Sequence, residues 1–387
     1  MLLLKNADVL APEPRGRADI LLAGERIERI APGIDIPPAY CEVVDASAFL
    51  AVPGFIDCHV HILGGGGEGG YATRTPELQL SDAVRGGVTT VVGCLGTDGV
   101  TRSLPALLAK ARGLEEEGIS TFIYSGYYTV PLQTITGHIE RDLLLIDKVI
   151  GSGEVAISDH RSTQPTFDEL ARVASETRRG GILSGKAGVV NVHLGDGRRG
   201  LALLRRVVEE TEIPAMQFLP THMNRNPSLF EEAVEWVKAG GLADFTTSTV
   251  PAYIEEGEVK AARALRRMVD AGAPASSLTF SSDGQGSLPR FDAGGRLVGL
   301  DVGRVTSLFA AVREAVQEER VPLETALAPI TSNPARILRL ARKGRLAGGA
   351  DADVVLLDPA ALSVEGVIAR GRWLMRGGEV LVRGTFE

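Results

Sequence analysis

The sequence contains little cysteine. Only three cysteines occur in 387 residues, Cys41, Cys58 and Cys94, and no CxxC pair is present. Small secreted domains that depend on disulfides use cysteine far more densely. We therefore expect all three thiols to be reduced, buried and structural.

Long runs of one charge and long apolar runs are also missing. The net charge is -8 with a pI near 5.5, and no tract rich in lysine and arginine occurs, which disfavours a nucleic-acid partner. No run of 18 apolar residues is present, and the first ten residues turn polar too soon for a signal peptide. We expect a cytoplasmic protein with no membrane partner.

Histidine is scarce, with six residues, yet two of them form an HxH pair. His59 and His61 follow the apolar residues Phe55 and Ile56, so they stand at the end of a predicted buried strand. Residues i and i+2 of a strand share a face, which brings both imidazoles to one point. Alternating polar residues are common in strands, so this pair alone is a modest signal of a metal site.

Three further polar residues also close apolar, strand-like runs: His193, His222 and Asp283. Taken singly, a histidine there is usually a hydrogen-bonded core residue, and an aspartate often caps the next helix. Imidazoles and carboxylates are, however, common ligands of divalent cations. Because four sites have the same placement, we predict that they form one metal centre.

The chain between these residues alternates β-branched runs with amphipathic helical stretches such as 103–118 and 228–240. Eight strand candidates can be counted: 55–61, 87–94, 120–126, 154–158, 188–193, 215–222, 243–249 and 278–283. Eight strand-helix units predict an α/β fold, a (β/α)8 TIM barrel spanning residues 54–343. In that fold the functional residues lie at the carboxyl ends of the strands, where every candidate ligand falls.

Both ends of the chain, residues 1–53 and 344–387, are rich in predicted strands and turn signals. Neither segment alone could bury a core. We therefore predict that the two termini form one small β-sandwich domain, with the barrel inserted between them.

The motifs around these residues resemble those of the amidohydrolase superfamily and, more narrowly, of isoaspartyl (β-aspartyl) dipeptidases. The resemblance rests on PGFIDCHVHILGGGGEGG, SDHRS, THMNRN and SSDGQGSLP. It implies a homo-oligomer, an octamer in the family, that hydrolyses the isopeptide bond of β-aspartyl dipeptides through a hydroxide bridging two zinc ions. By the resemblance His59 and His61 bind one ion, His193 and His222 bind the other, and Asp283 both binds metal and transfers protons.

The same resemblance assigns the substrate contacts. Glu68 would bind the free α-amino group, and Arg161 and Arg225 would bind the carboxylates, which a guanidinium matches with two hydrogen bonds. Gly66, Thr97, Tyr128 and Ser287 match further contact positions. The resemblance gives catalytic roles to Asp283, Glu68 and Tyr128, the last beside the developing oxyanion. The plain alternative is that the arginines are solvated and that Glu68 keeps a mobile loop soluble.

One position departs from the family pattern, in which a carboxylated lysine at the fourth strand bridges both metals. Glu154, seven residues before Arg161, stands there instead. Glutamate is about 3 to 4 Å shorter, so the backbone would have to approach the metals, which the glycines of segment 151–153 would permit. Two alternatives stay open: Glu154 points away from a one-metal site, or Lys148 or Lys186 provides the bridge.

Two other functions also stay open. The metal ligands do not distinguish a dipeptidase from a dihydropyrimidinase-like or hydantoinase-like enzyme, or from a deaminase. Glu68, Arg161 and Arg225 favour the dipeptidase. The other alternative is a scaffold without catalysis. Such a protein is expected to have lost metal ligands, and here the set of candidate ligands is intact.

Overall fold

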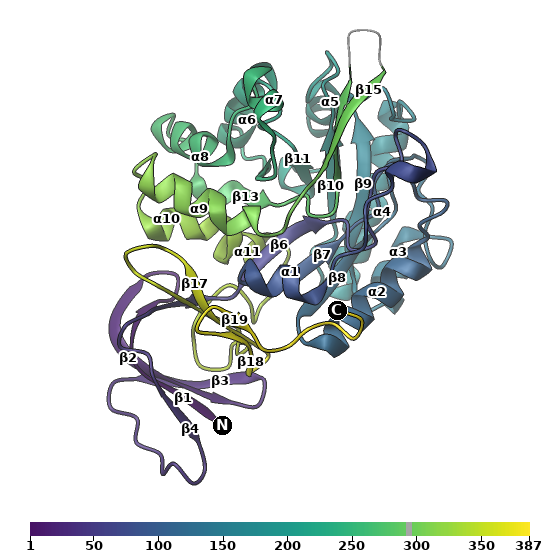
Figure 1. Cartoon of the computed structure of the whole chain (residues 1–387). Helices are drawn as coiled ribbons and strands as arrows, with labels where there is room; N and C mark the ends of the chain where they lie inside the picture. Colours follow the sequence, from purple (N-terminus) through teal and green to yellow (C-terminus); the bar gives the residue numbers. More distant parts are fainter. Residues whose placement is uncertain (292–295) are drawn as a thin grey trace.

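The structure, a computed structural model, describes residues 1–291 and 296–387. Its centre is a curled parallel sheet of six strands in the order β11-β10-β9-β8-β7-β6 (Figure 1). The strands are β6 (Phe55–Val60), β7 (Val88–Gly93), β8 (Ser120–Ser125), β9 (Val149–Ile157), β10 (Val189–Leu194) and β11 (Phe218–Thr221). Strand β9 begins earlier than the predicted 154–158, because the glycines in its first half gave no β signal.

Helices connect these strands and pack against them. They are α1 (Leu80–Arg85), α2 (Leu104–Glu117), α3 (Ile139–Leu145), α4 (Phe167–Ser184), α5 (Ala202–Glu210) and α6 (Pro227–Lys238). Capping residues mark where the longer helices begin. Thr166 and Glu169 form a capping box on α4, and Asn226 caps α6 ahead of a proline. Among the described residues, every helix is too short or too polar to span a membrane.

Two more parallel strands, β12 (Ala243–Thr246) and β13 (Leu278–Ser281), pair with each other as a separate ladder. All eight predicted strands are therefore present in an α/β fold, but the continuous ladder has six strands, and a full barrel is not established. The physical reason lies in β11 to β13, which are only four residues long, and in Pro220, which has no N–H to donate.

The remaining elements of this region complete the connections. They are α7 (Pro251–Glu255), α8 (Ala261–Asp270), α9 (Ser307–Gln317), α10 (Leu323–Leu327), α11 (Ser332–Ile337) and the 3-10 helices η1 (Tyr71–Thr73), η2 (Ala215–Gln217), η3 (Ala275–Ser277) and η4 (Ala328–Ile330). An antiparallel hairpin of β14 (Ser287–Phe291) and β15 (Leu297–Val302) follows Asp283. No pattern in the sequence predicted this antiparallel pair.

The two termini meet in one sheet of nine strands (Figure 1, purple and yellow). Its strands are β1 (Leu2–Leu10), β2 (Pro14–Ala23), β3 (Arg26–Ala31), β4 (Glu42–Asp45), β5 (Leu50–Pro53), β16 (Val354–Leu357), β17 (Val364–Ala369), β18 (Arg372–Arg376) and β19 (Glu379–Val380). The antiparallel pair β5 and β16 joins the two halves. The hydrogen bonds thus give one sheet and do not separate the two sheets of a sandwich; the domain boundaries at residues 53 and 344 stay a prediction.

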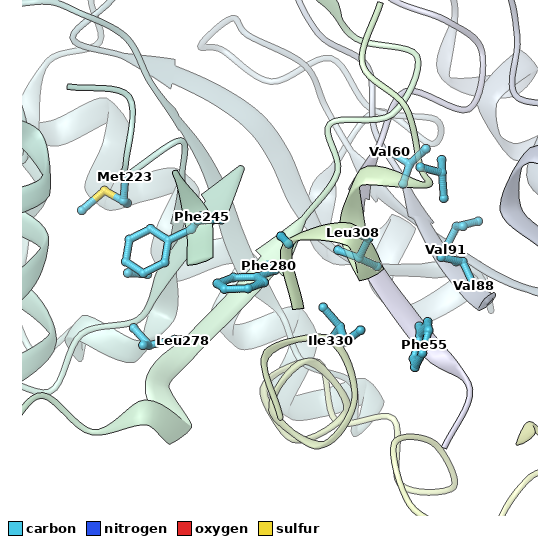
Figure 2. Packing of buried hydrophobic residues seen from close by; sticks show 14 of the residues in the cluster. Phe55, Val60, Val88, Val91, Met223, Phe245, Leu278, Phe280, Leu308 and Ile330 are labelled. Carbon is cyan, nitrogen blue, oxygen red and sulfur yellow. The ribbon is translucent and has the colours of Figure 1, made fainter. Parts of the chain in front are cut away.

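Apolar side chains fill the space between the strands and the surrounding helices. In the view of Figure 2, Phe245 and Phe280 lie toward the left of this core and Phe55, Val88 and Val91 lie toward its right. The Phe55 ring also stacks on Phe309 of α9, with 4.9 Å between ring centres. This packing fixes the strands relative to one another, so that polar side chains at their carboxyl ends have defined positions.

Candidate metal centre

The carboxyl ends of five strands bring the predicted ligands together. His59 and Glu154 lie within β6 and β9, His193 lies near the end of β10, and His61, His222 and Asp283 stand just after strands. His222 and Asp283 have positive φ angles of 61° and 52°. Such angles are uncommon for residues with a side chain and occur often at functional sites.

Glu154 lies at the middle of the cluster. Its Oε2 is 3.5 Å from His59 Nε2 and 3.8 Å from His61 Nε2. Its Oε1 is 2.7 Å from His193 Nδ1 and 3.4 Å from His222 Nε2. Glu154 therefore points into the cluster, and one carboxylate contacts both pairs of histidines.

The close approach of the backbone that a glutamate needs here is present. A Cβ at Gly153, where φ is 132°, would lie 2.4 Å from the carbonyl oxygen of Asn191. A Cβ at Gly151 would lie 2.5 Å from that of Val189. Only glycine allows β9 to pack this closely on β10, which brings the backbone of Glu154 toward the histidines.

The two lysines considered as alternative bridges lie elsewhere. Lys148 Nζ donates to the carbonyl of Thr121 at 3.1 Å. Lys186 Nζ donates to the carbonyls of Leu143 and Ile146 at 2.7 and 2.6 Å. Both amines are engaged with other segments, and Glu154 is the group that contacts both pairs of histidines.

The cluster has the unsatisfied polar atoms expected of a cation site. Among the described residues, His59 Nε2, Glu154 Oε2 and Asp283 Oδ1 are buried without a hydrogen-bond partner. Asp283 Oδ1 lies 3.6 Å from His59 Nε2 and 3.0 Å from His61 Nε2. Orphaned buried groups are costly, and a divalent cation would satisfy all of them at once.

A second group of ligand atoms shares Glu154. Atoms of Glu154, His193 and His222 lie within 4.8 Å of one another, as do atoms of His59, His61, Cys94 and Glu154. The nitrogen and oxygen donors fit Zn²⁺ or a similar ion, so the residues could hold two ions on either side of one carboxylate. Sequence reasoning missed the nearness of Cys94, which it treated as structural.

The surroundings set the charge of the acidic groups. Burial raises the pKa of Asp283, but the close approach of His61 and the charges of the histidines outweigh this and lower it to about 2. Burial likewise raises the pKa of Glu154, and the charges of His59 and His193 hold it well below its usual range. Both groups are therefore anions at neutral pH and available to cations.

Each candidate ligand histidine has an outer partner that sequence reasoning missed. The pairs are His59 Nδ1 with Asn191 Oδ1 at 3.1 Å, His61 Nδ1 with Cys94 Sγ at 3.8 Å, His193 Nε2 with Asp159 Oδ2 at 2.9 Å, and His222 Nδ1 with Thr246 Oγ1 at 2.6 Å. Such partners fix the orientation of a ligating imidazole. Their positions in strands were the signal that the sequence offered. Asn191 precedes His193 by two residues in β10, and Thr246 ends β12, the strand that follows His222 in the chain.

The predicted substrate residues surround a cavity of about 600 Å³ over the cluster. Glu68 accepts from Arg161 Nη1 at 3.2 Å and from Ser287 Oγ at 3.0 Å. Tyr128 Oη lies 2.8 Å from His193 Nδ1, and Arg225 Nη1 lies 3.5 Å from His193 Nε2. Gly66 and Thr97 also line the cavity.

All thirteen predicted site residues are thus brought to one place. The structure adds Glu258, whose buried Oε1 has no partner among the described residues and which lines the same cavity. Burial raises the pKa of Glu258 to about 7. Glu258 lies outside every motif, so no local pattern pointed to it.

Known proteins resemble this chain in sequence and in fold. The model of the amidohydrolase family matches residues 50–374. The crystal structure of β-aspartyl dipeptidase from Fervidobacterium islandicum AW-1, in complex with β-Asp-Leu dipeptide, is 48% identical with a TM-score of 0.91 and covers 98% of both chains. A D-hydantoinase structure, at 20% identity and a TM-score of 0.70 over 99% of this chain and 97% of that one, shares the fold.

Among curated proteins, dihydroorotase of Staphylococcus aureus (strain N315) is 42% identical over 91 residues, which are 24% of this chain and only 20% of that protein. Dihydroorotase of Leifsonia xyli subsp. xyli (strain CTCB07) is 27% identical over 89% of this chain and 84% of its own length. The resemblance to β-aspartyl dipeptidases is confirmed by the solved structure, and the chain belongs to the amidohydrolase family.

Proposed function

We propose that the protein hydrolyses the isopeptide bond of β-aspartyl dipeptides and uses two divalent cations to do so. We propose Zn²⁺ as the cation. The observation that carries the proposal is the cavity itself, in which Glu68 and Arg161 pair at 3.2 Å beside the cluster around Glu154. An ammonium and two carboxylates need an acidic group and arginines of this kind. The 48% identity to a β-aspartyl dipeptidase solved with β-Asp-Leu supports the same substrate class.

The side chains divide the work by their chemistry. Cations bound in the cluster would polarise the scissile carbonyl and lower the pKa of water. Asp283, an anion whose Oδ1 faces His59 and His61, would accept a proton from the attacking water and return it to the leaving amine. Burial raises the pKa of Tyr128 well above its usual range, so its hydroxyl stays protonated and can donate to the developing oxyanion.

The proposal also covers the closure of the barrel, the oligomeric state, the location of the protein and its partners. We propose that the eight strands close into one barrel, supported by backbone hydrogen bonds from His61 to Gly284 at 2.9 Å and from Met223 to Asp244 at 3.1 Å. We propose further that the protein is a cytoplasmic homo-oligomer, an octamer by the family resemblance. We propose that it binds neither nucleic acid nor a membrane. Size-exclusion chromatography with light scattering tests the oligomer.

The first test compares linkage isomers. We expect β-Asp-Leu to be hydrolysed and α-Asp-Leu to be nearly inert, because the amino group and carboxylates that Glu68 and Arg161 meet are placed differently in the two. Release of leucine from each isomer by the Zn²⁺-loaded protein measures this. Equal turnover of both, or turnover of hydantoins alone, would refute the proposed substrate and favour the cyclic-amide alternative.

Replacing Arg225 tests the carboxylate contact. Arg225 lines the cavity, and a bond to a substrate carboxylate is made in both the ground state and the transition state. We expect Arg225→Ala to raise KM by about 10- to 100-fold, the size of one charge-assisted hydrogen bond, with a much smaller change in kcat. Arg198→Ala, an exposed change outside the cavity, serves as the control. A large loss of kcat at unchanged KM would contradict this role.

A further inference from the structure

The carboxylate of Asp159 joins two groups that the proposed reaction uses separately. Its Oδ2 lies 2.9 Å from His193 Nε2 and accepts from Arg161 Nη2 at 2.8 Å. Its Oδ1 accepts from the backbone N–H of Arg161 at 2.7 Å and from Arg161 Nε at 3.0 Å. One buried carboxylate thus holds a candidate cation ligand and a candidate substrate arginine.

The surrounding chain is shaped to hold Asp159 in this place. Asp159 follows directly on Ser158, which has a positive φ of 53° just after the end of β9. Gly195, after the end of β10, leaves the room, since a Cβ there would lie 2.5 Å from Cβ of Asp159. Asp159 is only 7% exposed. Any side chain at position 195 would push the carboxylate of Asp159 away from His193.

The contact decides which nitrogen of His193 can bind a cation. A carboxylate only accepts hydrogen bonds, and each ring nitrogen of His193 faces one: Nε2 faces Asp159 and Nδ1 faces Glu154. When a cation binds on the side of Glu154, the proton of a neutral ring is left on Nε2, toward Asp159. The lone pair of a neutral ring is then on Nδ1, which lies 2.7 Å from Glu154 Oε1 inside the cluster. Without Asp159 the other tautomer and a turned ring become available.

Arg161 depends on the same carboxylate. Three of its N–H groups donate to Asp159, while Nη1 reaches Glu68 at 3.2 Å across the cavity. The guanidinium is therefore held with one edge toward Asp159 and another toward the cavity, where a ligand carboxylate would meet it.

From this geometry we propose that Asp159 is a positioning residue that couples cation binding at His193 to carboxylate binding at Arg161. The identity of the carboxylate rests on the proposed function, but the coupling between the two sites does not. When a ligand carboxylate pairs with Arg161, less of the guanidinium charge acts on Asp159. Asp159 then accepts more strongly from His193 Nε2, and Nδ1 becomes a better donor to a cation. Such coupling is reciprocal by linkage.

The experiment measures Zn²⁺ affinity by chelator competition, with and without L-aspartate as the carboxylate probe. Wild-type protein, Asp159→Asn and Arg161→Ala are compared, and exposed Asp168→Asn on α4 is the matched control. Free aspartate itself binds Zn²⁺, but equally for every variant, so differences between variants belong to the protein. Circular dichroism and melting temperature establish that each variant is folded.

We expect aspartate to tighten the weaker of the two Zn²⁺ sites about fivefold or more in the wild type and in Asp168→Asn. Asp159→Asn should weaken that site about 10- to 100-fold and abolish the effect of aspartate. Arg161→Ala removes the guanidinium charge from Asp159, so it should bind Zn²⁺ at that site about as tightly as the wild type does with aspartate, and it should show no further effect of aspartate. This variant tests the coupling even if Asp159→Asn fails to fold.

Wild-type Zn²⁺ affinity in Asp159→Asn, or an aspartate effect that survives in Arg161→Ala, would overturn the inference. A protein that hydrolyses no β-aspartyl dipeptide but still shows the expected Zn²⁺ pattern would refute the proposed function and leave the coupling intact. The two failures are therefore distinguishable.

Discussion

We expect Asp283→Asn to lower kcat by about 10²- to 10⁴-fold, the range of a lost general acid-base group. The amide has nearly the shape of the carboxylate, and its oxygen can still face His59 and His61, which lie 3.6 and 3.0 Å from Oδ1. It cannot accept a proton from the attacking water. Steady-state hydrolysis of β-Asp-Leu at saturating substrate measures the change.

Elemental analysis of the purified Asp283→Asn variant measures its cation content, which is needed to interpret a loss of kcat. A nearly full complement of ions with a collapsed kcat separates proton transfer from cation binding. Asp270→Asn, an exposed change at the end of α8, is the control and should behave as wild type. A kcat near the wild-type value for Asp283→Asn would exclude Asp283 from proton transfer.

Glu154→Ala should remove at least one of two cations and reduce activity to below about one hundredth. Replacing even an outer partner of a ligand costs about 10- to 100-fold, so the loss of a shared direct ligand should cost at least as much. Glu154 approaches His193 Nδ1 at 2.7 Å and His59 Nε2 at 3.5 Å, so its removal affects both groups of ligands. Exposed Glu212→Ala is the control.

The same residue makes a prediction about carbon dioxide. A carboxylated lysine forms only from neutral amine and CO₂, whereas Glu154 is already an anion, because the charges of His59 and His193 outweigh the effect of burial on its pKa. We therefore expect metal-free protein to regain Zn²⁺ and activity equally in CO₂-free and bicarbonate-containing buffer. Strong stimulation by bicarbonate, together with loss of Zn²⁺ in Lys148→Ala or Lys186→Ala, would place the bridge on a lysine.

The sequence by itself predicted the candidate ligands and the edge of the sheet that they share. His59, His193 and Asp283 could be identified because each ends an apolar run, and parallel strands carry their functional residues at one end. The twofold period of a strand put His61 beside His59. Composition alone accounted for the buried free thiols, since Cys41, Cys58 and Cys94 are buried and unpaired. These features depend on neighbours along the chain, which a sequence displays directly.

Only the tertiary structure decided how the candidate ligands are held and charged. His59 meets Asn191 across 132 positions of sequence, and Ser287 meets Glu68 across 219. The join of both termini into one sheet through β5 and β16, and the split of eight strands into a ladder of six and a ladder of two, depend on packing between distant segments. Asp159 is the clearest case: its place in the sequence predicts a loop residue, and its role follows from the simultaneous approach of His193 and Arg161, which no local pattern encodes.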